Sequence, residues 1–512
     1  MTDWTAGYIA DVEYTYGYYA ELNPLRVKLA FLNAGLACPA MGTACELGFG
    51  QGLSANLHAA ASVTRWHGTD FNPSQAGYAQ ELAAVSGAQA QLFDEAFADF
   101  AARTDLPEFD YIGLHGIWSW ISDENRATIT DFLRRKLKVG GVLYISYNTQ
   151  PGWAAFAPMR HLLTEHAATM GAPGDGIVRR VDDAIGFAGR LLATNPAYAK
   201  ANPQVAERVK KLQSLDRHYL AHEYFNRDWH PMHFAQMVEW LEPAKLSFAC
   251  SANYLDLIDG VNLTNEQQTF LKEIADPLFR ESVRDFMVNV QFRKDYWVKG
   301  PRKLSALEQG EITRAQKFIL TTHRPAVPLK MQGAVGEAAL SAEIYGPILD
   351  ALADHQPKTL GQIELAMRDH PAISFAHIVQ SAIVLCSGGH LSAVQDDAVI
   401  AAARTHSSKL NAYLLDRARG SGDITYLASP VTGGGVAVGR FQQIFMVALK
   451  QGLEQPADWA KYAWQLLSEQ RQTIVKDGVA LDSVEQNVAE LTGQALAFEA
   501  TQLPVLRALG II

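Results

Sequence analysis

A short stretch after an apolar strand carries an acid and three spaced glycines that could hold a ligand. Glu46 is followed by Gly48, Gly50 and Gly52 in the segment CELGFGQGLSANLHAA, residues 45–60. Glycines let the backbone pass close to a ligand without a Cβ in the way, and they tolerate positive φ. A helix expected after the turn points its free N–H groups at whatever lies there. The turn is therefore a candidate ligand-binding site.

Two common nucleotide-binding turns do not fit this segment. A dinucleotide fingerprint needs G-x-G-x-x-G, but Leu53 stands at the third site and the third glycine comes one position early. A P-loop needs Gly-Lys-Ser/Thr, and no lysine stands between residues 29 and 100. The spacing E-x-G-x-G-x-G instead resembles the turn of class I S-adenosylmethionine methyltransferases.

The resemblance implies cofactor contacts at the ends of the next two strands. Asp70 comes 18 residues after Gly52 and would accept both ribose hydroxyls, because a carboxylate accepts two hydrogen bonds in a fork. Phe71 would lie against the adenine, and Asp94 would accept a hydrogen bond from the adenine amino group. The alternative is a strand-turn-helix without a ligand, in which the glycines only allow tight packing and Asp70 caps a helix. That alternative explains each feature separately, but not their order along the chain.

Later stretches are similar to a narrower group, the bacterial methyltransferases that carry a methyltransferase regulatory domain. That group includes lysine methyltransferases that act on bacterial outer-membrane proteins. This chain departs from it in having Asn23-Pro24 for a His-Pro pair in the leader, and Phe49 where cysteine is common. The matching positions are His115-Gly116, Trp118-Ser119-Trp120, Tyr147-Asn148-Thr149, Pro151-Gly152-Trp153 and, in the regulatory domain itself, His222-Glu223-Tyr224.

Methyl transfer requires an aligned nucleophile, exclusion of water and the handling of one proton. The resemblance places His115 beside the methyl donor, either facing the substrate as a base or positioning the methionine end of the cofactor. Asn148 would accept a hydrogen bond from an attacking amine, or cap its own loop. Trp118, Trp120 and Trp153 would wall a channel for a lysine side chain by cation–π contact, or form part of the core.

The elements that must position these residues follow from the hydrophobic pattern. Short apolar strands alternate with helical stretches from residue 43 to about 160, which predicts a doubly wound α/β, Rossmann-like sheet. Ligands of such sheets bind beyond the carboxyl ends of the strands. We predict four parts: an N-terminal leader or lid (1–40), an S-adenosylmethionine-binding methyltransferase domain (41–160), a helical regulatory domain (161–330) and a mainly helical C-terminal domain (331–512).

The leader and the C-terminal part carry two further local patterns. Tyr14, Tyr16, Tyr18 and Tyr19 would fold over the cofactor as a lid, or form an arm that packs in a dimer. The stretch ITYLASPVTGGGVAV is typical of a β-hairpin, with three glycines after a proline turn. The basic stretch FRKDYWVKGPRK, residues 292–303, is expected to be a solvated segment between helices.

Four histidines near the regulatory signature raise the question of a metal. His218 and His222 would share a helix face, with His230 and His233 close in sequence. No H-E-x-x-H forms there, because Tyr224-Phe225-Asn226-Arg227 follows Glu223. We therefore predict no metal, and assign these residues to packing between helices.

Composition narrows the class of protein. Of the 512 residues 48% are hydrophobic and 19% charged, and the net charge of 44 − 54 = −10 argues against a nucleic-acid partner. No apolar run approaches the ~18 residues of a membrane span. The four cysteines are scattered and the N-terminus lacks the basic start of a secretory signal, so we expect a cytoplasmic protein with free thiols.

The sequence thus predicts an S-adenosylmethionine-dependent methyltransferase whose acceptor is a protein side chain, most plausibly a lysine nitrogen. O- or N-methylation of a small molecule or of a cell-surface glycan is the alternative within enzymes. A cofactor-binding protein that serves as a regulatory or scaffolding subunit is the alternative outside them. Relatives also suggest a homodimer.

Overall fold

The computed structural model describes residues 5, 7–9, 15–172 and 174–512. Its centre is a seven-stranded sheet in the order β3-β2-β1-β4-β5-β7-β6. Strands β1 to β5 run parallel, and β7 is antiparallel to both of its neighbours. The strands are β1 (Thr43–Leu47), β2 (Arg65–Thr69), β3 (Ala90–Phe93), β4 (Phe109–Leu114), β5 (Leu137–Asn148), β6 (Leu246–Ser251) and β7 (Phe292–Lys299). The predicted α/β, Rossmann-like fold is confirmed.

Alternating side chains give this sheet two buried faces. Ala44, Tyr111 and Tyr144 belong to the core on one face, whereas Cys45 and Ile112 belong to the core on the other. Burial on both sides is what parallel strands with helical crossovers require. The helices of this region are α1 (Pro24–Asn33), α2 (Leu53–Ala61), α3 (Pro73–Ser86), α4 (Phe97–Ala102) and α5 (Asp123–Lys136).

The ends of these helices follow local capping chemistry. The Asn23 side chain accepts a hydrogen bond from the Leu25 amide at the start of α1, and Asn72 caps α3 in the same way. Proline occupies the first position of both helices, where its missing N–H costs nothing. Gly87 ends α3 with φ of 62°. These caps fix where the loops between strand and helix begin.

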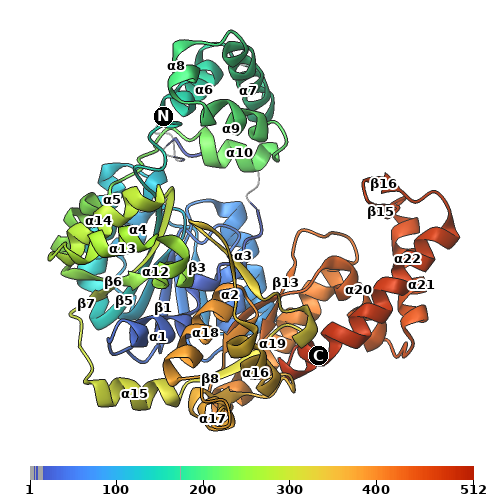
Figure 1. Cartoon of the computed structure of the whole chain (residues 1–512). Helices are drawn as coiled ribbons and strands as arrows, with labels where there is room; N and C mark the ends of the chain where they lie inside the picture. Colours follow the sequence, from blue (N-terminus) through green and yellow to red (C-terminus); the bar gives the residue numbers. More distant parts are fainter. Residues whose placement is uncertain (1–4, 6, 10–14, 173) are drawn as a thin grey trace.

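A separate helical module follows β5 and stands above the sheet (Figure 1). It buries its own core, which includes Val181, Ile185 and Leu220. α10 lies on the side of the module that faces the sheet (Figure 1). Its helices are α6 (Ala157–Thr169), α7 (Ile177–Ala193), α8 (Ala197–Ala201), α9 (Gln204–Leu212) and α10 (Arg217–Tyr224).

The chain then returns to complete the sheet, which corrects two expectations. Residues 246–251 and 292–299 form β6 and β7, so the sheet extends beyond residue 160, where the prediction ended the methyltransferase domain. The basic stretch 292–303 was expected to be solvated, but its first part is the buried strand β7. The helices around it are α11 (Phe234–Leu241), α12 (Asp259–Asn262), α13 (Asn265–Lys272) and α14 (Pro277–Val288).

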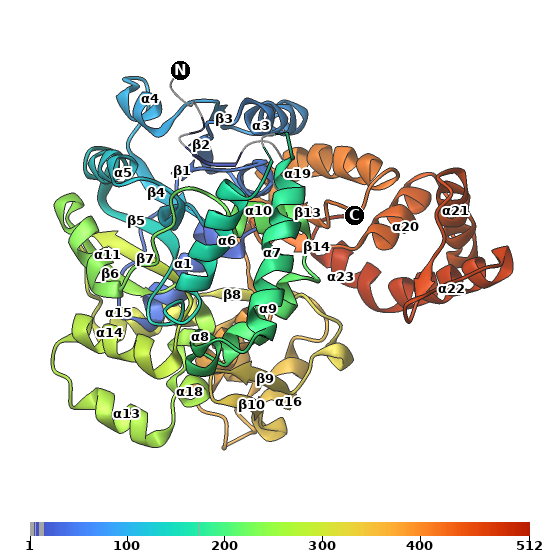
Figure 2. The same ribbon diagram turned by 90° about the horizontal axis from the view of Figure 1, so that it is seen from above.

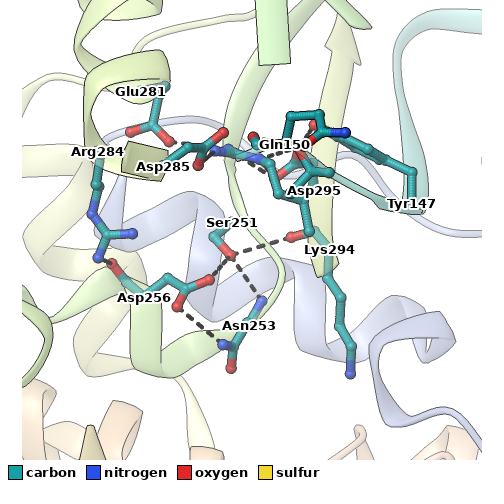
Figure 3. A network of polar contacts seen from close by, with 12 residues as sticks. Tyr147, Gln150, Ser251, Asn253, Asp256, Glu281, Arg284, Asp285, Lys294 and Asp295 are labelled. Carbon is teal, nitrogen blue, oxygen red and sulfur yellow. Dashed lines mark hydrogen bonds and ion pairs between the residues drawn. The ribbon is translucent and has the colours of Figure 1, made fainter. Parts of the chain in front are cut away.

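Strand β7 carries buried charged side chains, which are paired with residues of α14 and β5. Arg293 is 6% exposed and pairs with Asp285 at 2.5 Å, Glu281 at 3.0 Å and Asp295 at 3.0 Å. The hydroxyl of Tyr147 donates to Asp295 at 2.7 Å. Figure 3 shows the acids converging between α14 and the sheet. A network of this kind ties α14 to the last strands of the sheet.

The C-terminal part packs against the sheet domain through α19, which lies on α2 and α3, and extends sideways through α21 and α22 (Figure 2). The predicted hairpin is confirmed as the antiparallel pair β13–β14. A second sheet has the order β11-β8-β12. The elements are α15 (Ala306–Arg314), β8 (Lys317–Leu320), β9 (Lys330–Gly333), β10 (Gly336–Ala339), α16 (Ala342–Ala351), β11 (Lys358–Thr359), α17 (Leu360–Ala366), α18 (Phe375–Ser387), β12 (Leu391–Ala393), α19 (Asp397–Ala418), β13 (Tyr426–Ser429), β14 (Gly434–Ala437), α20 (Arg440–Lys450), α21 (Pro456–Glu469), β15 (Val475–Lys476), β16 (Val479–Ala480), α22 (Val484–Ala497) and α23 (Leu503–Ala508). Across the described residues, we find no helix with the length and apolar character of a membrane span.

Candidate active site

A deep cleft opens at the carboxyl ends of β1, β2 and β4. Its free space is about 1270 Å³ when the open mouth is counted. The glycine turn lines it together with the residues that follow β2 and β4. Residues of the leader line the same cleft, among them Tyr8, Gly17 and Tyr19. The leader, the glycine turn and the loops after β2 and β4 thus line the same cleft.

The glycine turn is shaped by positive φ at three positions. Gly48, Gly50 and Gly52 have φ of 74°, 58° and 67°, a conformation that favours glycine. A Cβ on Gly52 would stand 2.3 Å from the Ala79 Cβ, so this glycine also lets α2 pack against α3. A Cβ on Gly48 would stand 2.5 Å from the side chain of Ile117, which packs directly on this glycine and also lines the cleft. The glycines of the turn therefore allow close packing of α2 on α3 and of Ile117 on the turn itself.

Asp70 follows β2 and faces the glycine turn. Its Oδ2 accepts a hydrogen bond from the Gly50 amide at 2.8 Å, and its Oδ1 accepts one from the Asn72 amide at 3.0 Å. Burial raises the pKa of Asp70 to about 6, although both amides act in the opposite direction. Two amides leave acceptor positions free on the carboxylate, which can accept about four hydrogen bonds. Asp70 can thus still hold two hydroxyl groups.

Glu46 lies at the same end of β1 and is 2% exposed. Its Oε2 is shielded from solvent and has no hydrogen-bond partner among the described residues. Burial, and then the neighbouring charge of Asp70, raise the pKa of Glu46 to about 8. An unsatisfied buried carboxyl oxygen is costly, and none of the described residues supplies a donor to this one.

The mouth of the cleft carries an aromatic bridge between the leader, β2 and the helical module. The ring of Tyr8 meets Phe71 edge-on, with centroids 5.8 Å apart at 89°. The same tyrosine lies 5.6 Å from the ring of His222 in α10. Next to it, the Ile9 amide donates to the Asn226 side chain at 2.9 Å. The leader is thereby attached to both sides of the cleft.

The inner end of the cleft is formed by His115, directly after β4. Its Nδ1 lies 2.8 Å from the hydroxyl of Tyr144, and Tyr19 stacks on its other side with centroids 3.6 Å apart. Burial lowers the pKa of His115 to about 3, with Glu21 opposing this effect and Lys294 adding to it. The imidazole is therefore neutral in the physiological range.

Comparison with known proteins agrees with this geometry. The sll1526 protein of Synechocystis is 37% identical to this chain over 99% of both sequences. The family "Predicted methyltransferase regulatory domain" matches residues 216–299. This chain belongs to the class I methyltransferases that carry that domain. The methyl donor of these enzymes is S-adenosylmethionine.

Similarity to a solved structure extends over the whole chain. PKMT2 from Rickettsia typhi, solved in complex with AdoHcy, gives a TM-score of 0.70 at 16% identity, covering 97% of this chain and 99% of its own. RP789 of Rickettsia prowazekii is 24% identical over 55% of this chain and 51% of its own length. The regulatory-domain match includes β6 and β7. In this methyltransferase, residues of the so-called regulatory domain are thus part of the catalytic sheet.

The structure brings most of the predicted cofactor residues of the methyltransferase together, with one exception. Glu46, Gly48, Gly50, Gly52, Asp70, Phe71 and His115 all line the cleft. Asp94 is exposed and is not among the lining residues, whereas Glu95, Ala96 and Phe97 are. The chain turns inward only after Asp94, because Asp70 N donates to the carbonyl of Phe93 and Thr69 Oγ1 to that of Glu95.

Three predicted catalytic residues lie outside the cleft. Trp118 is fully buried in the short helix η2 (Trp118–Trp120), against Trp240. Asn148 is buried, and its backbone pairs with Ser119 and Met232. Trp153 belongs to the core of the helical module, where its indole N–H donates to the Gln291 carbonyl at 2.8 Å. Of the three tryptophans, Trp120 lines the cleft.

The leader contributes to the site largely through residues other than those the sequence indicated. Tyr14 lies outside the described residues, and Tyr16 and Tyr18 pack against Tyr78 and His58 rather than in the cleft. Tyr19 alone of the four predicted lid tyrosines lines the cleft in the described part of the chain. Tyr8 and Tyr144 were missed; every residue from 141 to 148 is buried, so the strand pattern does not single out Tyr144.

The histidine cluster of the regulatory domain is dispersed. His222 packs against Tyr8, His233 stacks on Phe286 with centroids 6.2 Å apart, and His230 lies 3.7 Å from Asp228. In the parts of the chain that the structure describes, no group of three or more His, Cys, Asp or Glu side chains could hold a metal ion.

Proposed function

We propose that this methyltransferase moves the methyl group of S-adenosylmethionine to a side-chain nitrogen of a protein, with lysine as the acceptor. The observation that carries the proposal is the pair Glu46 and Asp70 on either side of the glycine turn. Both carboxyl groups are buried and line one cleft, and Glu46 has an oxygen without a partner among the described residues. Donors in the ligand would satisfy both.

The residues of the cleft suit different parts of the cofactor. We assign the ribose hydroxyls to Asp70, which retains free acceptor positions, and the ammonium of the methionine part to Glu46. Phe71 would lie against the adenine, with Ala96 and Phe97 beside it in place of Asp94. The opposite charge of an ammonium would favour the ionised form of Glu46, whose pKa burial otherwise raises to about 8.

When bound, S-adenosylmethionine supplies a methyl group on a sulfonium, and an attacking lone pair displaces the sulfur as the carbon–sulfur bond breaks. The attacking amine must be neutral, and the inner end of the cleft favours that form. His115 is neutral because burial lowers its pKa to about 3, and Tyr19 and Tyr144 surround it. A cation is disfavoured in such surroundings, because burial penalises the charged form of an amine. We therefore assign to His115 and Tyr19 the positioning of the acceptor.

The choice of a protein acceptor is supported by the whole architecture. The structure of this chain matches that of PKMT2, a protein lysine methyltransferase of Rickettsia, from the sheet domain through the C-terminal part. Phe292, at the start of β7, is 39% exposed and its ring lies 6.2 Å from His115. An apolar residue at that position can contact the stem of a long side chain.

We also place the enzyme in the cytoplasm, where its free cysteines would stay reduced.

Two measurements test the proposal in sequence. Calorimetry with S-adenosylhomocysteine should detect binding by the wild type and a loss of about tenfold or more in Asp70→Ala, since hydrogen bonds to charged groups contribute about 1.5–3 kcal/mol. Asp99→Ala, an exposed acid on α4, is the matched control. Unchanged affinity in Asp70→Ala would remove the assignment of the cleft.

The acceptor is tested with methyl-labelled S-adenosylmethionine and a host lysate. Label should enter protein and, after hydrolysis, appear in methylated lysine. Label in small molecules or glycans would instead support the alternative enzymatic function. Cofactor binding without label in any fraction would support a regulatory or scaffolding protein.

A further inference from the structure

A second cavity lies behind the leader segment that borders the cofactor cleft. Its free space is about 1150 Å³ when its mouth is counted. Its walls come from parts of the chain far apart in sequence: the leader with α1, the short helix η4 (Tyr254–Leu257), the β8–β12 sheet and the β13–β14 hairpin. No step of the proposed methyl transfer uses this space. Its lining therefore requires a separate explanation.

Among the described residues that line this cavity, Arg26 of α1 is the one with a charged side chain. Its guanidinium lies 4.1 Å from the ring centroid of Tyr254, and its Nη1 donates to the Cys386 carbonyl at 3.5 Å. Its Nε is shielded from solvent and has no hydrogen-bond partner within the described ranges. The acid nearby in sequence, Glu21, is already paired with Lys294 at 2.7 Å. The Nε–Nη2 edge of Arg26 thus has no acceptor among the described residues, and a ligand would have to displace the groups that shield Nε to reach it.

The guanidinium of Arg26 has no carboxylate at ion-pairing distance in the described part of the chain, because Glu21, whose charge acts on it, is bound to Lys294. Partial withdrawal of such a cation from water is costly. The planar Nε–Nη2 edge matches a carboxylate with two parallel hydrogen bonds. We propose that this cavity is a binding site for a small organic monocarboxylate, held by that edge of Arg26. Binding at this site is separate from the proposed methyl transfer and does not depend on it.

The remaining walls indicate the rest of the ligand. Tyr18 and Tyr426 face one another with ring centroids 5.0 Å apart, and Leu25 and Phe318 add apolar surface. Hydroxyl-bearing residues such as Thr322 lie among them. A single cation with aromatic and apolar walls suits one negative charge on an aromatic or branched apolar body. A dianion such as phosphate would lack its second cation.

The leader forms the partition between the two cavities. Gly17 and Tyr19 line the cofactor cleft, whereas Tyr18 and Ala20 line the second cavity. This alternation means that a carboxylate ligand would touch the back of the same segment whose Tyr19 stacks on His115. The position is suited to an effector that acts on the active site.

The test uses 4-bromobenzoate as the probe and the full chain saturated with S-adenosylhomocysteine, so that the cofactor cleft is filled. Calorimetry should detect 4-bromobenzoate but not its neutral isostere 4-bromobenzamide. Arg26→Gln should weaken binding by about tenfold or more, and Arg26→Lys, which keeps the charge but loses the fork, by less. Arg404→Gln, an exposed arginine on α19, should bind as the wild type does. Equal affinity of the wild type for 4-bromobenzoate and 4-bromobenzamide would overturn the proposal. So would an affinity of Arg26→Gln for 4-bromobenzoate equal to that of the wild type.

A measurement on the unaltered protein covers the case in which Arg26 variants do not fold. In crystals grown with 4-bromobenzoate, the anomalous signal of bromine should lie in the second cavity beside the Tyr18–Tyr426 pair, with the carboxylate toward Arg26. Bromine elsewhere, or no bromine in the second cavity at probe concentrations that saturate the calorimetric signal, would contradict the site.

Discussion

The ring of Tyr19 stacks on that of His115, with centroids 3.6 Å apart and planes inclined by 21°. Tyr19 comes from the leader and His115 from the end of β4, so this contact attaches the leader to the catalytic edge of the sheet. Tyr144, on β5, holds the same imidazole through its hydroxyl at 2.8 Å. The leader thus forms a wall of the site at the point where we place the acceptor.

Removal of this wall should reduce turnover more than cofactor binding. We expect Tyr19→Ala to lower the rate of methyl incorporation into lysate protein by about tenfold or more, because a misplaced acceptor loses much of the benefit of orientation. Tyr19→Phe keeps the ring and should stay close to the wild type. Affinity for S-adenosylhomocysteine, measured by calorimetry, should change little in either variant. A full rate in Tyr19→Ala would show that the stack has no part in catalysis.

The raised pKa of Glu46 predicts proton release on cofactor binding. Its value of about 8 in the free protein means that the carboxyl group is mostly protonated at about pH 7, and an ammonium ligand would favour the ionised form. Calorimetry with S-adenosylhomocysteine in buffers of different ionisation enthalpy should therefore show proton release at about pH 7 and less at about pH 9. Glu46→Gln should release fewer protons and bind more weakly.

Glu95→Gln provides the matched control for this experiment. Glu95 lines the same cleft and also has a shielded oxygen, Oε2, without a partner among the described residues, but its Oε1 forms an ion pair with Arg103 at 2.7 Å. Its variant should release protons as the wild type does. Equal release by wild type and Glu46→Gln would assign the proton to another group.

Trp118 should act on stability and not on an acceptor channel. Its side chain is fully buried against Trp240, and truncation of a buried aromatic to alanine costs about 3–5 kcal/mol. We expect Trp118→Ala to lower the denaturation midpoint strongly. Trp120→Ala, which changes a residue of the cleft, should affect turnover instead. A folded, fully stable Trp118→Ala with low turnover would restore the sequence-based interpretation.

Local patterns were sufficient for the first part of the sheet and for its ligand turn. Apolar runs gave β1 to β5, and the order of Glu46, the glycines and Asp70 gave the cofactor cleft. Because Trp118 is aromatic, the sequence suggested that it walls an acceptor channel. The short helix η2 determines where the side chains point, and it places Trp120 in the cleft and Trp118 in the core. The inward turn after Asp94 likewise depends on loop hydrogen bonds that carry no sequence signature.

Strand β7 shows why the rest could not be read locally. Its sequence, FRKDYWVK, has three consecutive charged residues, 293–295, and a fourth at its end, a composition typical of a solvated segment. Arg293 and Asp295 are nevertheless buried, because Asp285 on α14 and Tyr147 on β5 bind them. Those partners lie 8 and 148 residues away along the chain. A buried strand of this kind depends on tertiary pairing and not on its own hydrophobicity.

The Arg293 network makes a prediction about the dependence of stability on pH. Burial raises the pKa of Asp285 to about 7, and Asp295 adds to this, while Arg293 opposes it. In the unfolded chain the pKa is the ordinary one of about 4. The folded protein then binds more protons between these values, so this group lowers stability as the pH rises from about 4 to about 7. Asp285→Asn should remove that part of the slope in denaturation midpoints measured across this range.

Removal of Arg293 should make the decrease in stability with rising pH steeper than it is in the wild type. Arg293→Met leaves Glu281, Asp285 and Asp295 facing one another without compensation, and loss of one partner from a buried pair costs about 3–5 kcal/mol. Because protonation neutralises the acids, the loss should be greatest above about pH 7 and shrink toward about pH 5. The exposed pair Arg419–Asp416 offers the control, since Arg419→Met should cost about 1 kcal/mol or less. A loss in Arg293→Met that is equal at both pH values would show that packing over Phe234 and Phe248, and not charge, is what the arginine contributes.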